Sequence, residues 1–166
     1  GEGITGIGLG GVALGAGGKL KGLMASGVAM GSGEGISGIA LSGVALGAGG
    51  RLTGIMASGF AVGSGKGITG LALSGGVVGS GGELKGIAIG GLGVSLEEVT
   101  GLVVGGINGI VVDHLSFSIH NERFHGLSIG VLNFTRRLHG VQIGLINYAR
   151  NNPKYLRVVP FINVHR

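Results

Sequence analysis

The residues of this chain whose types could support chemistry lie in its last third. Residues 126–130 read GLSIG, which matches the G-x-S-x-G pattern that presents the nucleophile of serine hydrolases. That pattern needs a strand-to-helix turn, with an aspartate and then a histidine later in the chain, but no aspartate follows Asp113. The serine lacks the partners of a catalytic triad, so we expect no enzymatic activity and no small-molecule substrate.

Two histidines and several glycine-rich phrases are the other candidates for chemistry. His125 and His139 occupy the same place in two similar phrases, so neighbouring strands would bring them close enough to share a metal ion. Neither phrase supplies an acidic third ligand, and we therefore expect exposed histidines and no metal site. GEGITG, GEGISG and GKGITG match G-x-G-x-x-G, but no strand–helix–strand unit surrounds them, so no cofactor is expected.

The elements that must position these residues are sequence repeats. The first 95 residues form six successive units with a period of 16, beginning at residues 1, 17, 33, 49, 65 and 81. We number the columns of the repeat from the first glycine of each unit. A unit this short cannot bury its own apolar face and must stack on its neighbours, which is typical of solenoids.

Apolar residues and glycines keep fixed columns in the repeat. Large apolar side chains fill columns 4, 7 and 12, and we expect them to point inward, with small Gly, Ala and Ser outward. Columns 6 and 11 are always glycine, which permits a positive φ or the close approach of another backbone. We predict corners at columns 1, 6 and 11. The predicted structural corner glycines are Gly6, Gly22, Gly38, Gly54, Gly70, Gly86, Gly11, Gly27, Gly43, Gly59, Gly75 and Gly91.

The pattern predicts an all-β fold, a Gly-rich β-solenoid with about 16 residues per coil. The repeat array would occupy residues 1–112, and degenerate repeats with a more polar C-terminal cap would follow in residues 113–166 of the same domain. Columns 8 and 9 exchange their larger residue between alternate units, as in Met24-Ala25 and Ala40-Leu41, which leaves a true period of 32 open.

Two other arrangements fit the same columns. In a membrane β-sheet or barrel, each unit would be one long strand, and GG, GE or GK would form the hairpin turn. Packed helices with small-xxx-small spacing are the third arrangement. Glycine at about a quarter of the positions, and uncharged stretches shorter than about 20 residues, count against helices.

Charge placement separates one edge of the repeat from the rest. Through residue 112, every charged side chain falls in columns 2, 3 or 5, so we expect this edge to be exposed. The signs mostly alternate from unit to unit, as in Glu2, Lys19, Glu34 and Arg51, so stacked neighbours would attract weakly. Charged residues make up only 11% of the chain, and aromatic residues 4%, which is too few for a nucleic-acid groove.

The C-terminal third contains two richer units, FHGLSIGVLNFTRR (124–137) and LHGVQIGLINYARNNP (138–153). Asn133 and Asn147 fill the same slot, and their amides are expected to form a hydrogen-bonded ladder. The phrase H-G-[LV]-x-I-G-[LV]-[LI]-N, together with the VVPFIN ending, resembles the GLQIGLIN-like repeats of bacterial surface-repeat proteins of the leptospiral type. The resemblance covers this third only and implies an exported envelope protein.

These observations predict a non-enzymatic structural or adhesive protein of a bacterial cell envelope or surface. We expect self-association through the uncapped N-terminal edge, and contact with an envelope polymer or membrane. Because the chain opens without Met or an export signal, it is expected to be a processed or truncated product. The expected interaction surface consists of Arg136, Arg137, His139 and Tyr148.

Two alternative functions remain open at this stage. The first is a membrane-inserted sheet or pore, which follows from the long-hairpin arrangement. The second is ice binding, since a flat face of small residues would carry a row of hydroxyl groups in column 5, interrupted by Lys21 and Lys85. The hydroxyl row consists of Thr5, Ser37, Thr53, Thr69 and Thr100.

Overall fold

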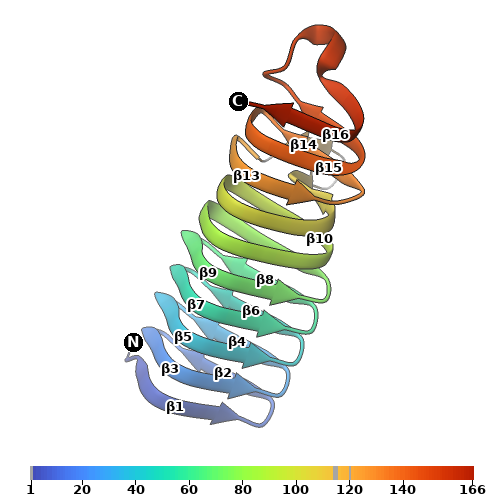
Figure 1. Cartoon of the computed structure of the whole chain (residues 1–166). Coiled ribbons are helices and arrows are strands. Elements are labelled where there is room, and N and C mark those ends of the chain that lie inside the picture. Colours follow the sequence, from blue (N-terminus) through green and yellow to red (C-terminus); the bar gives the residue numbers. More distant parts are fainter. Residues whose placement is uncertain (1, 114–115, 120) are drawn as a thin grey trace.

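The computed structural model describes residues 2–113, 116–119 and 121–166 of the chain. It confirms the predicted all-β solenoid, with parallel strands stacked in about eight turns at a spacing of about 16 residues (Figure 1). Each unit pairs with the next in parallel register, so that Leu20 lies beside Ile36 and Leu52 beside Ile68. Because successive units run in the same direction, the array contains neither the long antiparallel hairpins nor the packed helices weighed above.

Each coil of the repeat contains one long and one short strand. The long strands are β1 (Ile4–Gly10), β3 (Lys19–Ser26), β5 (Gly35–Ser42), β7 (Arg51–Ser58) and β9 (Gly67–Ser74). The short strands are β2 (Ala13–Ala16), β4 (Ala29–Ser32), β6 (Ala45–Ala48) and β8 (Ala61–Ser64). The strand β10 (Val77–Asn108) then continues without interruption through the following coils.

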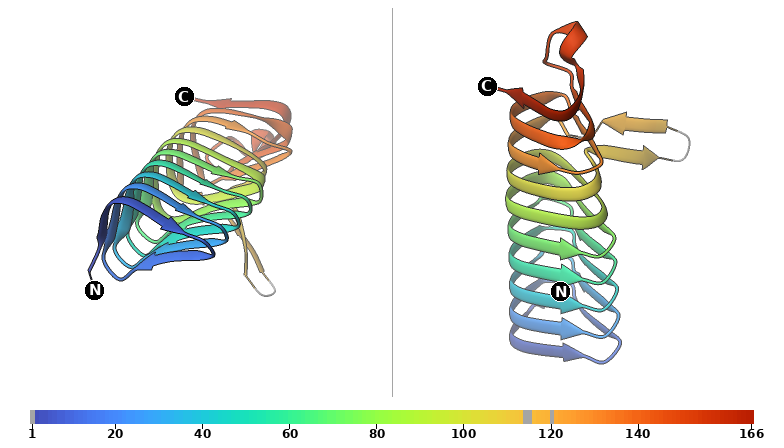
Figure 2. Two further views of the ribbon diagram at one scale, coloured as in Figure 1. Left: turned by 90° about the horizontal axis from the view of Figure 1, so that it is seen from below. Right: turned by 45° about the vertical axis from the view of Figure 1, so that its right-hand side comes forward.

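The C-terminal part continues the same stack and then closes it. The stacked strands are β13 (Arg123–Ile129), β14 (Leu132–Thr135) and β15 (Arg137–Ala149), and β13 pairs in parallel with β10. After the short helix η1 (Lys154–Leu156), β16 (Val158–His165) pairs antiparallel with β15 and covers the end. A separate antiparallel hairpin of β11 (Ile110–Asp113) and β12 (Ser116–Ile119) projects from the side (Figure 2, right).

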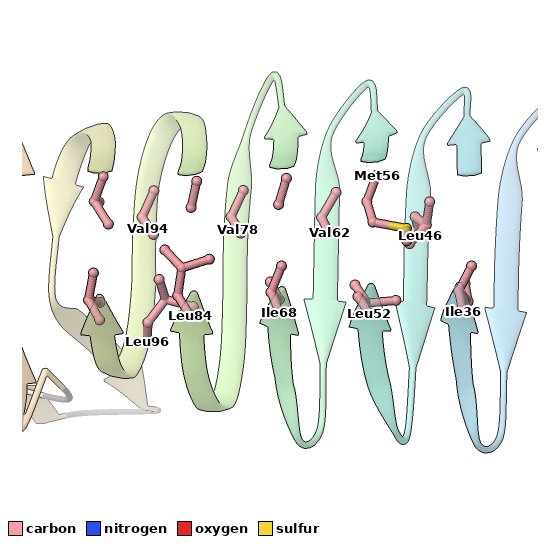
Figure 3. Close-up of a cluster of buried hydrophobic side chains, with 14 of the residues drawn as sticks. Ile36, Leu46, Leu52, Met56, Val62, Ile68, Val78, Leu84, Val94 and Leu96 are labelled. Carbon is pink, nitrogen blue, oxygen red and sulfur yellow. The ribbon is translucent and has the colours of Figure 1, made fainter. Parts of the chain in front are cut away.

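The core is built from columns 4, 8 and 14. Side chains of these columns point into the coil and stack on the same column of the neighbouring coils (Figure 3). Column 4 supplies Leu20, Ile36, Leu52, Ile68 and Leu84, column 8 supplies Met24, Ala40, Met56 and Ala72, and column 14 supplies Met30, Leu46, Val62, Val78 and Val94. All of these residues are at most 3% exposed, so they form the buried interior of the stack.

The prediction that columns 7 and 12 point inward is wrong. Ile55 in column 7 is 43% exposed and Phe60 in column 12 is 54% exposed, whereas Leu52 in column 4 is fully buried. Side chains alternate between the two faces of a strand, so columns 4 and 8 can share the inner face but column 7 cannot. Only column 4 of the three predicted columns belongs to the core.

The prediction that serine points outward is also wrong for much of the array. Ser32, Ser42, Ser64 and Ser74 are at most 8% exposed. The Ser64 hydroxyl accepts the Gly67 N–H at 3.0 Å and donates to a backbone carbonyl. Serine is therefore used at the ends of both the short strands (Ser32, Ser64) and the long strands (Ser42, Ser74), because its hydroxyl satisfies backbone groups left free by the turn.

The question of a 16- or 32-residue period is resolved by the direction of columns 8 and 9. Register partners are 16 residues apart, so each coil is one unit, and the exchange of large and small residues is a packing pattern. Column 8 points inward, where a methionine fills the space left by the smaller residue of the next coil. A Cβ added to Gly8 would lie 2.7 Å from Sδ of Met24, which already occupies that space.

The invariant glycines of columns 6 and 11 in the repeat are needed for different physical reasons. Column 6 lies inside each long strand with φ between +110° and +134°, and we infer that the strand bends there. Column 11 follows the long strand, as at Gly43 between β5 and β6, with no positive φ. There a Cβ would collide with the carbonyl oxygen of Gly27 in the preceding coil, so the position has no room for a side chain.

Candidate functional site

An exposed apolar surface runs along the long strands. We call it the outer face and define it as columns 7 and 9 of the first six coils: Ile7, Leu9, Leu23, Ala25, Ile39, Leu41, Ile55, Ala57, Leu71, Leu73, Ile87 and Ile89. Exposure of its large side chains reaches 75% at Leu9 and is 37% at Ile89, while Leu71 and Leu73 are partly buried. No charged residue interrupts the two columns. Isolated exposed apolar residues are normal on a protein surface, but a continuous apolar band is typical of a contact surface.

The outer face is not uniform along column 9. Large and small residues alternate over five coils, in the order Leu9, Ala25, Leu41, Ala57 and Leu73. An open hollow of about 630 Å³ runs past Leu9, Ala25, Leu41 and Ala57 along the neighbouring glycines. The face therefore presents a regular series of projections and depressions.

A second apolar hollow lies at the C-terminal end of the same side. Its volume is about 750 Å³, and its walls include Ile89, Val104, Ile129 and Ile143, with Phe161 from the capping strand β16. The Phe161 backbone has a φ of +67°, an uncommon conformation for a residue with a side chain. Both hollows are open and apolar, and neither has the convergent polar groups with which a small-molecule pocket fixes its ligand.

The charged columns form a second surface, which we call the charged edge: Glu2, Lys19, Lys21, Glu34, Arg51, Lys66, Glu83 and Lys85. The part between Lys19 and Lys66 surrounds an open hollow of about 600 Å³. Four cationic side chains, those of Lys19, Lys21, Arg51 and Lys66, line this hollow together with one carboxylate, that of Glu34. The local excess of positive charge favours an anionic partner.

Ion pairs between coils occur further along the charged columns. Arg123 lies 2.6 Å from a Glu98 oxygen, and Arg136 lies 2.6 Å from a Glu122 oxygen. Lys85 pairs instead with Glu83 of its own coil, at 3.1 Å. Since these side chains are exposed, each pair contributes only about 0.2–1 kcal/mol, which favours the register without holding the fold together.

The four residues predicted as the interaction surface do not form one patch. Arg137 and His139 are exposed at the start of β15, and Arg136 precedes them with its guanidinium paired to Glu122. Tyr148 lies at the far end of β15, where it pairs with Phe134 of β14 at a ring-centroid distance of 6.1 Å. Tyr148 lies in column 15, on the short-strand side of the coil. Arg136, Arg137 and His139 lie in columns 2, 3 and 5, on the side of the charged columns.

The two histidines singled out from the sequence do stack on each other. The rings of His125 and His139 are 4.7 Å apart and nearly parallel, and His165 of β16 meets His139 edge-on at 6.0 Å. His165 was missed because it arrives on the antiparallel capping strand, outside the repeat. Over the described ranges 2–113, 116–119 and 121–166, no group of three or more histidine or acidic side chains is arranged to hold a metal ion.

The predicted asparagine ladder is confirmed and is longer than expected. Asn133 donates to Oδ1 of Asn147 at 2.8 Å, and Asn108 donates to Oδ1 of Asn133 at 2.8 Å. Asn147 in turn donates to the Val159 carbonyl of the capping strand at 3.2 Å. The three amides are at most 1% exposed and continue column 14, so they replace the apolar stack that ends at Val94.

Ser128, the serine of the hydrolase-like pattern, belongs to this buried network. It is 2% exposed and lies in column 8, which points into the coil. Its hydroxyl donates to Oδ1 of Asn133 at 2.8 Å. A buried hydroxyl bonded to an amide oxygen has neither access to substrate nor a base to remove its proton, so this geometry does not support a nucleophilic role.

The hydroxyl row of column 5 faces outward, as the ice-binding alternative requires, but two of its members interact with charged neighbours. Thr69 accepts a long hydrogen bond from Arg51 at 3.4 Å, and Thr100 donates to Glu83 at 3.4 Å. Lys21 and Lys85 stand in the same row. The row therefore forms part of the charged edge, and a regular hydroxyl lattice does not develop.

Comparisons with protein families, curated proteins and solved structures found no match to this chain. Within the part of the chain that the structure describes, no helical segment combines the length and the hydropathy of a membrane span.

Proposed function

We propose that the protein is a non-enzymatic structural or adhesive element of a bacterial cell envelope, which holds an anionic envelope polymer along its charged edge. The observation that carries the proposal is the hollow between Lys19 and Lys66, where four cations face one carboxylate. A linear polymer can follow such an edge over several coils at about 4.8 Å per coil, and an open groove suits it better than a compact ligand. The bacterial envelope as location rests on the resemblance of the C-terminal phrases.

The solenoid supplies a rigid support for that contact. Buried apolar stacks fix the backbone of these coils, so the cations of the second, fourth and fifth coils keep fixed positions along the edge. Individual exposed charges contribute little, but several charges on one rigid edge act together on a polymer that carries repeated anionic groups. We expect the interaction to weaken as salt rises, because the charges are exposed and screened.

Cosedimentation with isolated bacterial envelopes tests the proposal. The double substitution Lys19→Gln and Arg51→Gln removes two cations from the hollow, and at about 0.5 kcal/mol for each charge we expect binding to fall about fivefold. The matched control, Arg123→Gln with Arg136→Gln, removes the same charge from residues already paired to Glu98 and Glu122, and should change binding less than about twofold.

Salt provides the second arm of this experiment. Raising ionic strength from about 0.05 M to about 0.5 M should release most of the wild-type chain, since the Debye length falls to a few ångströms. Binding that survives both the Lys19 and Arg51 substitutions and the added salt would refute the charged edge as the adhesive surface. Loss of binding with the control pair alone would move the contact to the C-terminal coils.

A further inference from the structure

We infer that the outer face is an interface between two copies of this chain, which pack face to face with their solenoid axes antiparallel. This inference concerns a different surface from the charged edge and stands independently of the proposed function. It begins from the exposed apolar band of columns 7 and 9, which carries no charge across six coils. Sheets that pack face to face bury bands of this kind at a separation of about 10 Å.

The size of the band fits a dimer. Ten of its twelve residues are large, and at roughly 80 Å² of accessible area each they expose roughly 800 Å² in total. That exceeds the few hundred Å² that monomeric proteins usually leave as their largest apolar patch. Two copies would remove roughly 1,600 Å² from water, which is the usual size of a specific protein interface.

The alternation of column 9 indicates a second copy as the occupant. We place a two-fold axis in the interface, perpendicular to the solenoid axis and between the third and fourth coils. It sets the first coil of one copy against the sixth of the other, the second against the fifth, and the third against the fourth. Leu41 then faces Ala57 of the second copy, and Leu73 faces Ala25. Each of these inner pairs combines one large and one small residue, so projections of one copy enter the depressions of the other, while the outermost pair, Leu9 and Ile89, combines two large residues.

The parallel alternative fits less well. A two-fold axis along the solenoid axis would set column 7 against column 9 of the same coil, because this rotation reverses the direction of the strands across the interface. Ile39 would then face Leu41, while Leu23 would face Ala25, so crowded and loose coils would alternate. The antiparallel arrangement also keeps like charges apart, since Lys21 and Lys85 lie level with Thr69 and Thr5 of the second copy.

Sedimentation velocity over roughly 1–100 μM tests the interface, and we expect a reversible dimer of the wild-type chain. The variant Ile39→Lys with Ile55→Lys places two charges on exposed outer-face positions and should weaken dimerisation at least about 100-fold. The control Gly47→Lys with Gly63→Lys adds the same charges to the same two coils on the short strands β6 and β8, where a Cβ has room, and should remain dimeric. Circular dichroism of all three chains verifies the strand content.

The orientation is tested by thiol cross-linking, because the chain has no cysteine of its own. In the antiparallel dimer, Leu9 lies opposite Ile89 of the second copy, while the two Leu9 residues lie about 24 Å apart. A short bis-maleimide should therefore link Leu9→Cys chains to Ile89→Cys chains in a mixture, and should not link Leu9→Cys chains to each other. Linking of Leu9→Cys to itself would overturn the antiparallel geometry.

Three results would overturn the interface itself. One is a wild-type chain that stays monomeric up to roughly 100 μM. Another is an oligomer that survives Ile39→Lys with Ile55→Lys, which would place association elsewhere, for example at the open edge of β1. The third is flotation of a monomeric wild-type chain with neutral phosphatidylcholine vesicles, lost in the lysine variant, which would assign the outer face to a lipid surface. None of these results bears on envelope binding by the charged edge.

Discussion

Replacing Gly54 by valine is expected to lower the free energy of unfolding by at least about 3 kcal/mol. Gly54 has a φ of +112°, which a β-branched residue adopts only with strain. A Cβ at this position would also collide with the carbonyl oxygen of Gly38 in the preceding coil. The two penalties act together because the strand cannot move away without breaking its pairing on both sides. Chemical denaturation followed by circular dichroism measures the loss.

The matched control is Gly63→Val, which makes the same substitution in the short strand β8. Gly63 has no positive φ, and a Cβ there would meet no other atom within 4 Å. We expect a change of less than about 1 kcal/mol, and β-propensity favours valine over glycine at such a position. Equal losses at Gly54 and Gly63 would show that column 6 has no special backbone requirement.

Replacing Asn133 by valine is expected to cost about 2–5 kcal/mol, because it leaves buried polar groups without partners. Oδ1 of Asn147 would lose the amide that donates to it, and the Ser128 hydroxyl would lose its acceptor. The Asn108 amide would lose one of its acceptors as well. Asn133 is fully buried, so water cannot replace these bonds without opening the coil. Denaturant titration of the intact chain gives the cost.

Asn108→Val is the control for this prediction, in the same column and with the same change of shape. Asn108 is the first rung of the ladder, and its Oδ1 has no hydrogen-bond partner. After the substitution, Oδ1 of Asn133 would still accept the Ser128 hydroxyl, and the new valine would continue the stack that ends at Val94. We expect a cost of about 1 kcal/mol or less. A larger loss at Asn108 than at Asn133 would contradict the proposed order of the ladder.

The solenoid itself was predictable from the sequence because its period is short and its glycines are regular. The predicted direction of the side chains is wrong for columns 7 and 12, because the sequence pattern does not separate the apolar columns of the two faces. Columns 4, 8 and 14 are inward and column 7 is outward, which strict alternation along the strand requires. Leu52 and Ile55 look equivalent in the sequence, but they are three residues apart and so lie on opposite faces.

The candidate surfaces were likewise only partly predictable from the sequence. The sequence located the charged edge because charge falls in three columns only, and the structure adds the hollow that Lys19, Arg51 and Lys66 share. Asn108 could have been recognised, since Ile107-Asn108 repeats the Ile146-Asn147 phrase. His165 could not, because an antiparallel capping strand carries it outside the repeat and no periodicity places it beside His139.

The outward direction of columns 7 and 9 is the central claim, because the outer face and its dimer depend on it. Thiol modification tests it directly with two neighbouring single-cysteine variants, Ile55→Cys and Met56→Cys, in dilute solution. Ile55 is 43% exposed and Met56 is fully buried, so the thiol at 55 should react as a free one and the thiol at 56 on the order of 100-fold more slowly, through local opening. A protected thiol at 55 beside a reactive thiol at 56 would contradict the account.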